Sequence, residues 1–237
     1  RQLLAVPTGF TVHPKLAKQM DRRRTPLAER EIDWAQAEEL AFASLVTGGI
    51  PVRLTGQDTE RGTFSQRHLV FHDPKTGKRW APIQHLVGAT ATVELHNSPL
   101  SEYAALGFEY GYSAQAPESL VCCEAQFVDF ANGAQVIIDQ FIVSGLAKWG
   151  QPSRLTLLLP HGYEGAGPEH SSARLERFLQ LAAHGNMRVA NCSTAAQYFH
   201  LLRDQAITPT ARPLVIMTTK RLLRLAESSC TLDELAG

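Results

Sequence analysis

The sequence predicts an α/β domain with a mainly parallel sheet and helices on both faces. Four short segments are continuous apolar runs, as in strands that are buried on both faces. Three segments with helical spacing of apolar residues alternate with them. The apolar runs are 120–123, 155–159, 188–190 and 214–217, and the helical segments are near 133–145, 170–183 and 195–206. Strands that alternate with helices favour a parallel sheet built from helical crossovers.

The composition is that of an ordinary globular protein. Of the 237 residues, 44% are hydrophobic and 19% are charged, and 23 Lys and Arg balance 23 Asp and Glu. Balanced charge indicates no nucleic-acid partner and no anionic membrane surface. No apolar run approaches the roughly 20 residues that span a bilayer, so we expect no membrane span. The four cysteines have no CxxC spacing and are expected to be buried, reduced thiols, with the adjacent Cys122 and Cys123 on opposite sheet faces.

The first 31 residues are predicted to be a linker, and residues 32–237 a domain. Proline and glycine punctuate the linker, and its charged run 15–24 has room for one short helix. No signal peptide is visible. The chain begins with Arg1 rather than Met, which suggests a fragment of a longer protein.

A clear helix is predicted after the linker. Asp33 with Gln36 three residues later resembles a capping box, and the glycines at 48–49 end the helix. Its apolar stripe consists of Trp34, Ala37, Ala41 and Leu45.

The next stretch is less regular. Residues 51–54 are a short strand candidate followed by the polar loop 55–64, and in 65–96 a turn at 73–77 separates two strand-like pieces. Ser98 followed by Pro99 is predicted to begin a helix, because Pro fits the first helical position and Ser accepts an unpaired N–H. The first turn of this helix carries Glu102.

Three polar or glycine-rich loops follow predicted strands, at 56–64, 124–132 and 160–168. In a parallel sheet the carboxyl ends of the strands meet at one edge, where ligands bind. The sequence therefore predicts that these loops converge on a site.

Several residues near these loops could carry chemistry or serve the fold alone. Glu102 is either an acid that satisfies the dipole of a helix start or a functional carboxylate. Gln57 is either an ordinary loop amide or a neutral donor and acceptor for a ligand. Phe127 and Phe130 could stack on a heterocycle or belong to the core.

His170 is predicted to lie in a first helical turn, where the positive end of the dipole disfavours imidazolium. A neutral imidazole there could transfer a proton near physiological pH, although a packing or capping role is the alternative. The glycines of the preceding loop are ordered GxxGxG rather than GxGxxG, which supports a nucleotide-binding, flavodoxin-like domain only weakly.

Eight segments of the chain carry a resemblance to a known family. They are GQDTERGTF (56–64), LSE (100–102), FEYGY (108–112), EAQF (124–127), DFANGAQ (129–135), LLPHGYEG (158–165), GPEHSSAR (167–174) and AQYFHLLR (196–203). Together they resemble the decarboxylating component of the 2-oxoglutarate dehydrogenase complex. The similarity runs from about Gly9 to the C-terminal end and covers the transketolase-like pyrimidine-binding domain of that family with its entry linker.

The resemblance implies a thiamine-diphosphate enzyme of the oxidoreductase class. Such an enzyme decarboxylates 2-oxoglutarate and passes the succinyl group to the lipoyl group of a partner dihydrolipoyl acyltransferase. Family active sites form between the pyrimidine domain and the diphosphate domain of another subunit, so a homodimer is implied. The location implied is the bacterial cytoplasm or the mitochondrial matrix.

The resemblance also implies roles for individual residues. Glu102 matches the catalytic carboxylate that bonds ring nitrogen N1′ of the cofactor's aminopyrimidine and so activates the cofactor. His170 matches the histidine that faces the reacting centre, with a role in substrate binding or proton handling. The remaining cofactor-binding positions are Gln57, Leu100, Phe127 and Phe130, of which Leu100 and the phenylalanines shape the pyrimidine pocket.

Half of the implied site is absent from this chain. No GDG-type motif with a downstream Asn occurs, and in this class that motif holds the Mg2+ that bridges to the diphosphate. We therefore expect no metal ligands here and an isolated fragment that is inactive. A non-catalytic dimerisation or scaffold domain stays open as an alternative. So does a 2-oxoadipate dehydrogenase, because Ala166 stands where many 2-oxoglutarate enzymes carry Gln.

Overall fold

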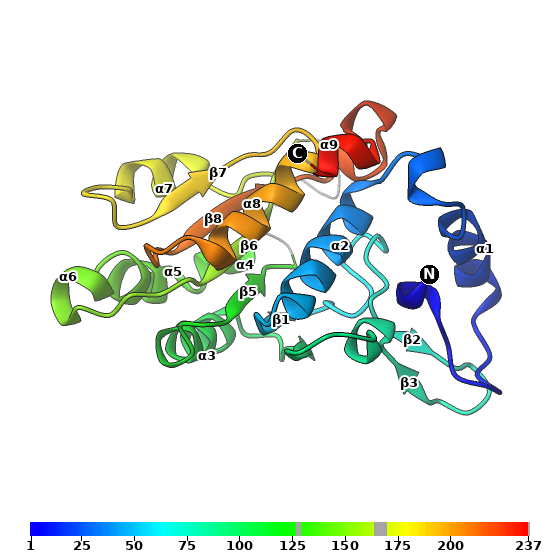
Figure 1. The fold of residues 1–237 in the computed structure, drawn as a ribbon. Helices are drawn as coiled ribbons and strands as arrows, with labels where there is room; N and C mark the ends of the chain where they lie inside the picture. Colours follow the sequence, from blue (N-terminus) through cyan, green and yellow to red (C-terminus); the bar gives the residue numbers. More distant parts are fainter. Residues whose placement is uncertain (127–128, 164–169, 237) are drawn as a thin grey trace.

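Six parallel strands in the order β4-β1-β5-β6-β8-β7 form the centre of the protein, with helices on both faces (Figure 1). The computed structural model describes residues 1–126, 129–163 and 170–236. The six strands are β1 (Val52–Gly56), β4 (Val93–Asn97), β5 (Leu120–Glu124), β6 (Thr156–Pro160), β7 (Arg188–Ala190) and β8 (Leu214–Thr218). A separate antiparallel pair joins β2 (Phe71–His72) to β3 (Arg79–Trp80). The predicted fold class is confirmed.

The helices cover the sheet as two layers. Figure 1 shows α2 and α8 side by side across one face, and α3 lies at the other side of the sheet. The α-helices are α1 (Pro14–Arg23), α2 (Trp34–Thr47), α3 (Glu102–Gln115), α4 (Asp129–Asn132), α5 (Gln135–Ile137), α6 (Gly145–Trp149), α7 (Leu175–Leu181), α8 (Ala195–Ile207) and α9 (Leu232–Ala236), with a π-helical turn at Ile138–Ile142. Short 3₁₀ turns are Gln2–Leu4, Leu27–Glu29, Pro82–His85, Leu222–Arg224 and Ala226–Ser228.

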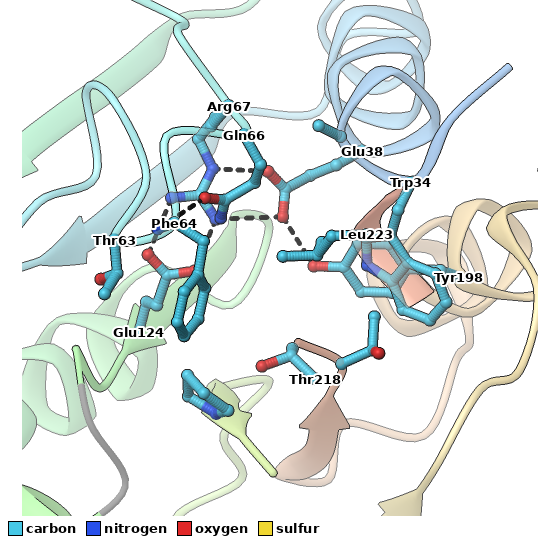
Figure 2. A pocket seen from close by; sticks show the side chains of 13 residues that line it. Trp34, Glu38, Thr63, Phe64, Gln66, Arg67, Glu124, Tyr198, Thr218 and Leu223 are labelled. Atoms are coloured by element: carbon cyan, nitrogen blue, oxygen red, sulfur yellow. Dashed lines mark hydrogen bonds and ion pairs between the residues drawn. The ribbon is translucent and has the colours of Figure 1, made fainter. Parts of the chain in front are cut away.

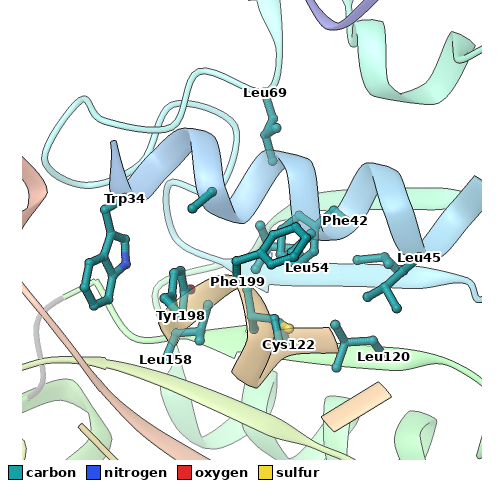
Figure 3. Close-up of a cluster of buried hydrophobic side chains, with 14 of the residues drawn as sticks. Trp34, Phe42, Leu45, Leu54, Leu69, Leu120, Cys122, Leu158, Tyr198 and Phe199 are labelled. Atoms are coloured by element: carbon teal, nitrogen blue, oxygen red, sulfur yellow. The ribbon is translucent and has the colours of Figure 1, made fainter. Parts of the chain in front are cut away.

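Two apolar cores form because side chains alternate across the buried strands. Cys122 belongs to the core under α2 and α8, which Figure 3 shows with Phe42, Leu54 and Phe199. Its neighbour Cys123 belongs to the core on the α3 side. All four cysteines are buried and free, as the sequence predicted.

Strand β4 was not predicted from the sequence. Val93 and Leu95 are buried, Glu94 between them is half-buried, and His96 and Asn97 at the end of the strand are exposed, as is usual at a sheet edge. The strand pairs with β1 along its whole length, so the segment before α3 is held at the sheet rather than being a loop.

Helix α3 begins three residues later than predicted. Ser101, not Ser98, is the N-cap, and its side chain accepts a hydrogen bond from the backbone N–H of Ala104. The backbone N–H of Ser98 donates to the carbonyl of Gly56 at 2.6 Å, which prolongs the pairing of β4 with β1. Glu102 is therefore the first residue of the helix.

Two predicted helices are shorter or more broken than expected. The segment 133–145 contains α5, the π turn and the start of α6 rather than one helix. Helix α7 begins at Leu175, so His170 precedes it and does not lie in its first turn. The helix-dipole argument for a neutral His170 is wrong for that reason.

The segment before α2 packs against the β2–β3 pair. The Trp80 indole N–H donates to the Ala5 carbonyl at 2.9 Å, and the backbone N–H of Thr11 donates to Asp73 Oδ2 at 3.1 Å. Helix α1 confirms the short helix predicted in 15–24. The Asp33 cap of α2 is formed, with Oδ1 accepting from the Gln36 N–H at 2.8 Å, but the Gln36 side chain bonds Arg30 instead of completing a capping box.

Candidate active site at the carboxyl edge of the sheet

The ends of β4, β1 and β5 are aligned side by side. Gly56, the last residue of β1, is in register with Asn97 of β4 and with Glu124 of β5. A Cβ at Gly56 would lie 2.6 Å from the Glu124 carbonyl oxygen, so only glycine allows this approach. The predicted loops at 56–64 and 124–132 therefore leave neighbouring strands at one edge, and the loop at 160–168 follows β6, the next strand along.

The loop after β1 is held by a residue of β4. Asn97 Oδ1 accepts hydrogen bonds from the backbone N–H of Thr59 at 2.9 Å and from its hydroxyl at 3.0 Å. It accepts a third from the backbone N–H of Glu60 at 3.3 Å. These bonds fix the chain two residues beyond Gln57.

Gln57 and Glu102 meet at this edge. Gln57 Nε2 donates to Glu102 Oε1 at 3.0 Å. The amide oxygen of Gln57 is buried, and it has no hydrogen-bond partner within the described chain. A buried acceptor without a donor is unfavourable unless a ligand or water supplies one. The pair thus offers a carboxyl group and a free acceptor close together.

Burial changes the acidity of Glu102. Desolvation raises its pKa to about 7, a hydrogen bond from the Gln126 backbone N–H lowers the pKa, and the charge of Glu124 raises it. A carboxyl with that pKa can hold or share a proton at neutral pH. The geometry therefore favours the functional interpretation of Glu102 over an acid on a solvated turn.

A second carboxylate network anchors the helix that carries Glu102. Glu109 lies two turns further along α3 and is only 1% exposed. Its carboxylate accepts hydrogen bonds from Arg53 Nε at 2.8 Å and from Thr55 Oγ1 at 2.8 Å. Arg53 and Thr55 both lie in β1, so α3 is fixed to the strand that leads into Gln57.

The predicted apolar wall is only partly described. Leu100 lies just before the helix cap with 79% of its surface exposed, so its contribution to a pocket stays a prediction. Phe127 lies outside the described residues. Phe130 lies in α4, and its side chain is outside the description as well. The stacking roles of both phenylalanines stay predictions.

His170 lies at the same edge as the end of β8. Its carbonyl accepts a hydrogen bond from Lys220 Nζ at 2.8 Å, two residues beyond β8. The catalytic role of His170 stays a prediction.

A buried charge network that the sequence did not predict joins α2 to the end of β5 (Figure 2). Arg67 is 2% exposed and bonds Glu124 at 2.6 Å and Glu38 at 2.5 Å. Tyr198 donates its hydroxyl proton to Glu38 at 2.6 Å and stacks on Trp34. Burial lowers the pKa of Arg67, but Glu124 and Glu38 together raise it well above its usual value, so the guanidinium stays charged.

The cavity beside this network is small. Its free volume is about 20 Å³, which holds about one water molecule. Thr63 lines it, and the Thr63 hydroxyl oxygen is buried without a partner among the described residues. The cavity is too small for a cofactor ring, and the Arg67 network stabilises the strand end rather than forming a ligand pocket.

One sequence signal could have revealed this network. Glu38 follows Trp34 by four residues and so falls on the buried stripe of α2. A carboxylate at a stripe position requires a cation, since buried charges are paired. Arg67 gives no comparable signal, because it lies in a stretch without regular structure.

Within the described ranges, no group of three or more His, Cys, Asp or Glu side chains is placed to hold a metal ion. Within the same ranges, no helix is long and apolar enough to cross a bilayer.

Comparison with known sequences adds to this geometry. The profile of a family described as "Transketolase, pyrimidine binding domain" matches residues 30–226. A Geobacillus kaustophilus (strain HTA426) protein named 2-oxoglutarate dehydrogenase E1 component is 61% identical over 94% of this chain and 24% of its own length. Proteins of the same name from Geobacillus sp. (strain WCH70) and Bacillus anthracis (strain A0248) are 58% and 56% identical over 99% of this chain and 25% of their own length. The chain spans about a quarter of the length of these relatives.

Proposed function

Because the chain belongs to the transketolase pyrimidine-binding domain family, we propose that it is the pyrimidine-binding half of a thiamine-diphosphate-dependent 2-oxoglutarate dehydrogenase. The full enzyme decarboxylates 2-oxoglutarate and transfers the succinyl group to the lipoyl group of a partner acyltransferase. The names of the relatives support this substrate. Since they are bacterial proteins, they favour the bacterial cytoplasm and give no support to a mitochondrial location.

The observation that carries the proposal is the pair formed by Glu102 and Gln57. A carboxyl with a pKa of about 7 lies 3.0 Å from an amide whose own oxygen is buried and unpartnered. An aminopyrimidine ring presents ring nitrogen N1′, which accepts a hydrogen bond from a protonated carboxyl, and an amino group, which donates to an acceptor oxygen. Glu102 and the amide oxygen of Gln57 supply one partner of each kind. The residues present therefore fit the ring.

Each residue has a defined task in this proposal. When bound, thiamine diphosphate supplies the carbon nucleophile that attacks the 2-oxo carbon and holds the electron pair left when CO2 departs. Glu102 holds the proton at the pyrimidine ring nitrogen, and its burial keeps that proton from exchanging freely with water. Gln57 orients the Glu102 carboxylate and accepts an N–H with its free oxygen. His170 binds the substrate or moves a proton during acyl transfer.

The rest of the site belongs to other parts of the full enzyme in this proposal. The diphosphate and Mg2+ are held by a second domain, and that domain comes from the other subunit of a homodimer. The exposed Leu100 then forms an apolar wall that the cofactor and the facing subunit cover.

The test uses the full-length enzyme with an artificial electron acceptor. We expect decarboxylation of 2-oxoglutarate that requires thiamine diphosphate and Mg2+, and its loss in Glu102→Ala while circular dichroism shows that the variant is still folded. Near-normal turnover of Glu102→Ala would refute the assigned role. A preference for 2-oxoadipate would replace the proposed substrate, and no turnover with either acid would favour the scaffold alternative.

A further inference from the structure

We propose that His161 is a positioning residue that fixes the segment of His170, an inference that rests on the proposed function. His161 directly follows β6, and its backbone N–H donates to the carbonyl of Thr218 at the end of β8 at 2.8 Å. This bond fixes the backbone of His161 at the carboxyl edge of the sheet.

The side chain of His161 then bonds the segment after His170. The backbone N–H of Ala173 donates to His161 Nδ1 at 3.0 Å. An imidazole nitrogen accepts a hydrogen bond only when it carries no proton, so the geometry assigns the ring proton to Nε2. The ring is thus in one tautomer and one orientation.

Two further bonds join the same segments. The backbone N–H of Gly162 donates to the Ser171 carbonyl at 2.8 Å, and Lys220 Nζ donates to the His170 carbonyl at 2.8 Å. Gly162 has φ of 144°, a conformation that favours glycine. Hydrogen bonds with His161, Gly162 and Lys220 therefore hold the backbone of residues 170–173 in place.

This arrangement separates two possible roles of His161. A catalytic residue would need its Nε2 at the reacting atoms, whereas a positioning residue needs only an acceptor at the place of Nδ1. The hydrogen bond of the His161 ring uses Nδ1, and its donor is a backbone N–H. The placement of His170 thus depends on His161 without requiring His161 to contact substrate.

Three variants of the full-length enzyme test the positioning role of His161. Asn places an acceptor where Nδ1 lies, Gln places its amide near the position of Nε2, and Ala supplies neither. We expect His161→Ala to lower kcat about 10-fold or more, His161→Asn to restore most of the activity, and His161→Gln to stay low. His184→Asn, an exposed histidine, is the matched control. Rescue by Gln but not by Asn would overturn the inference.

Hydrogen exchange gives a readout independent of turnover. The amide of Ala173 should exchange roughly 5-fold faster or more in His161→Ala and return toward the wild-type rate in His161→Asn. Unchanged exchange in His161→Ala would contradict the proposed bond.

A double mutant distinguishes this inference from the proposed function. If His161 acts through His170, the variant with both residues replaced by Ala should be no slower than His170→Ala. Fully additive losses would assign His161 an independent role and overturn the inference. A wild-type enzyme without 2-oxo acid turnover would instead overturn the proposed function, and with it the functional part of the inference.

Discussion

Gln57 Nε2 lies 3.0 Å from Glu102 Oε1, joining the loop after β1 to the first residue of α3. The two residues are 45 positions apart, and they meet because β4 pairs with β1 and delivers the chain to the start of α3. The contact uses the side-chain N–H of Gln57 and leaves its amide oxygen for a ligand.

Replacing Gln57 should weaken cofactor binding rather than unfold the protein. In the full-length enzyme, Gln57→Ala removes a donor to Glu102 and an acceptor for the ligand, so we expect the Kd for thiamine diphosphate to rise about 10-fold, or about 1.4 kcal/mol. Calorimetric titration measures it, with Gln115→Ala at the far end of α3 as the control. Equal affinities for both variants and the wild type would argue against contact between Gln57 and the cofactor.

The isolated 237-residue chain should bind thiamine diphosphate poorly. Its described residues supply no metal-binding group, and the proposed ring contacts lie on an open edge where Leu100 is 79% exposed. Calorimetry with thiamine diphosphate and Mg2+ measures the affinity. Tight binding that depends on Mg2+ would sink the proposal that a second domain holds the diphosphate.

The stability of the chain should depend on pH through Glu102. Its pKa rises from 4.5 to about 7 in the folded protein because of burial. The folded state then binds the proton more tightly than the unfolded state, so the free energy of unfolding falls as the pH rises from about 4.5 to 7. Glu39, whose burial also raises its pKa to about 7, acts in the same direction.

Glu102→Gln isolates the contribution of Glu102. The difference in free energy of unfolding, variant minus wild type, should rise by about 1–2 kcal/mol from pH 5 to pH 8, after allowance for the partial exposure of the carboxyl. Urea unfolding at both pH values measures the difference, with Glu118→Gln as an exposed control. If this difference in free energy of unfolding were the same at pH 5 and pH 8, Glu102 would have an ordinary pKa.

Removing Arg67 should destabilise the fold strongly. Arg67→Met leaves Glu38 and Glu124 buried without their cation, which costs about 3–5 kcal/mol. Arg61→Met breaks a pair with Asp58 in which the arginine is 54% exposed, so it should cost less than about 1 kcal/mol. Denaturant unfolding compares the two. Adding Glu38→Gln and Glu124→Gln to Arg67→Met should recover part of the loss, and similar losses for Arg67→Met and Arg61→Met would contradict the assigned burial.

Two glycines near Tyr110 should respond in opposite ways to alanine. A Cβ at Gly145 would lie 2.0 Å from the Tyr110 hydroxyl oxygen, so Gly145→Ala should lower stability by about 1–3 kcal/mol. A Cβ at Gly111, inside α3, would meet nothing within 4 Å, so Gly111→Ala should raise stability by about 0.5–1 kcal/mol. Thermal unfolding of the two variants measures these changes. A loss of stability in both variants would disagree with the open space at Gly111.

The sheet could be predicted largely from the sequence because its central strands are continuous apolar runs. Leu120 to Glu124 and Thr156 to Pro160 are buried at every position, and no helix-forming pattern competes with them. β4 could not be found this way, because an edge strand is stabilised by its neighbour more than by its own composition. The start of α3 was misplaced for the same reason, since pairing with Gly56 keeps Ser98 out of the helix.

The contact between Gln57 and Glu102 could be anticipated from the sequence, whereas the surroundings of His170 could not. The convergence of three loops follows from strand order, and Glu102 and Gln57 do meet. The helical environment expected for His170 was wrong, since its segment is fixed by bonds to residues of two other loops rather than by helix formation. Long-range hydrogen bonds of this kind leave no periodic signal in the sequence.

The pairing of β1 with strands far along the chain also affects how fast the protein can fold. Val52 pairs with Val93, 41 residues later, and with Leu120, 68 residues later. Parallel pairing over such separations makes folding slow. At roughly 5–20 residues per second, a ribosome needs about 3–14 s after Val52 before Leu120 emerges. During that time the apolar strand that leads to Gln57 has no partner on one side, and an unpaired apolar strand favours aggregation.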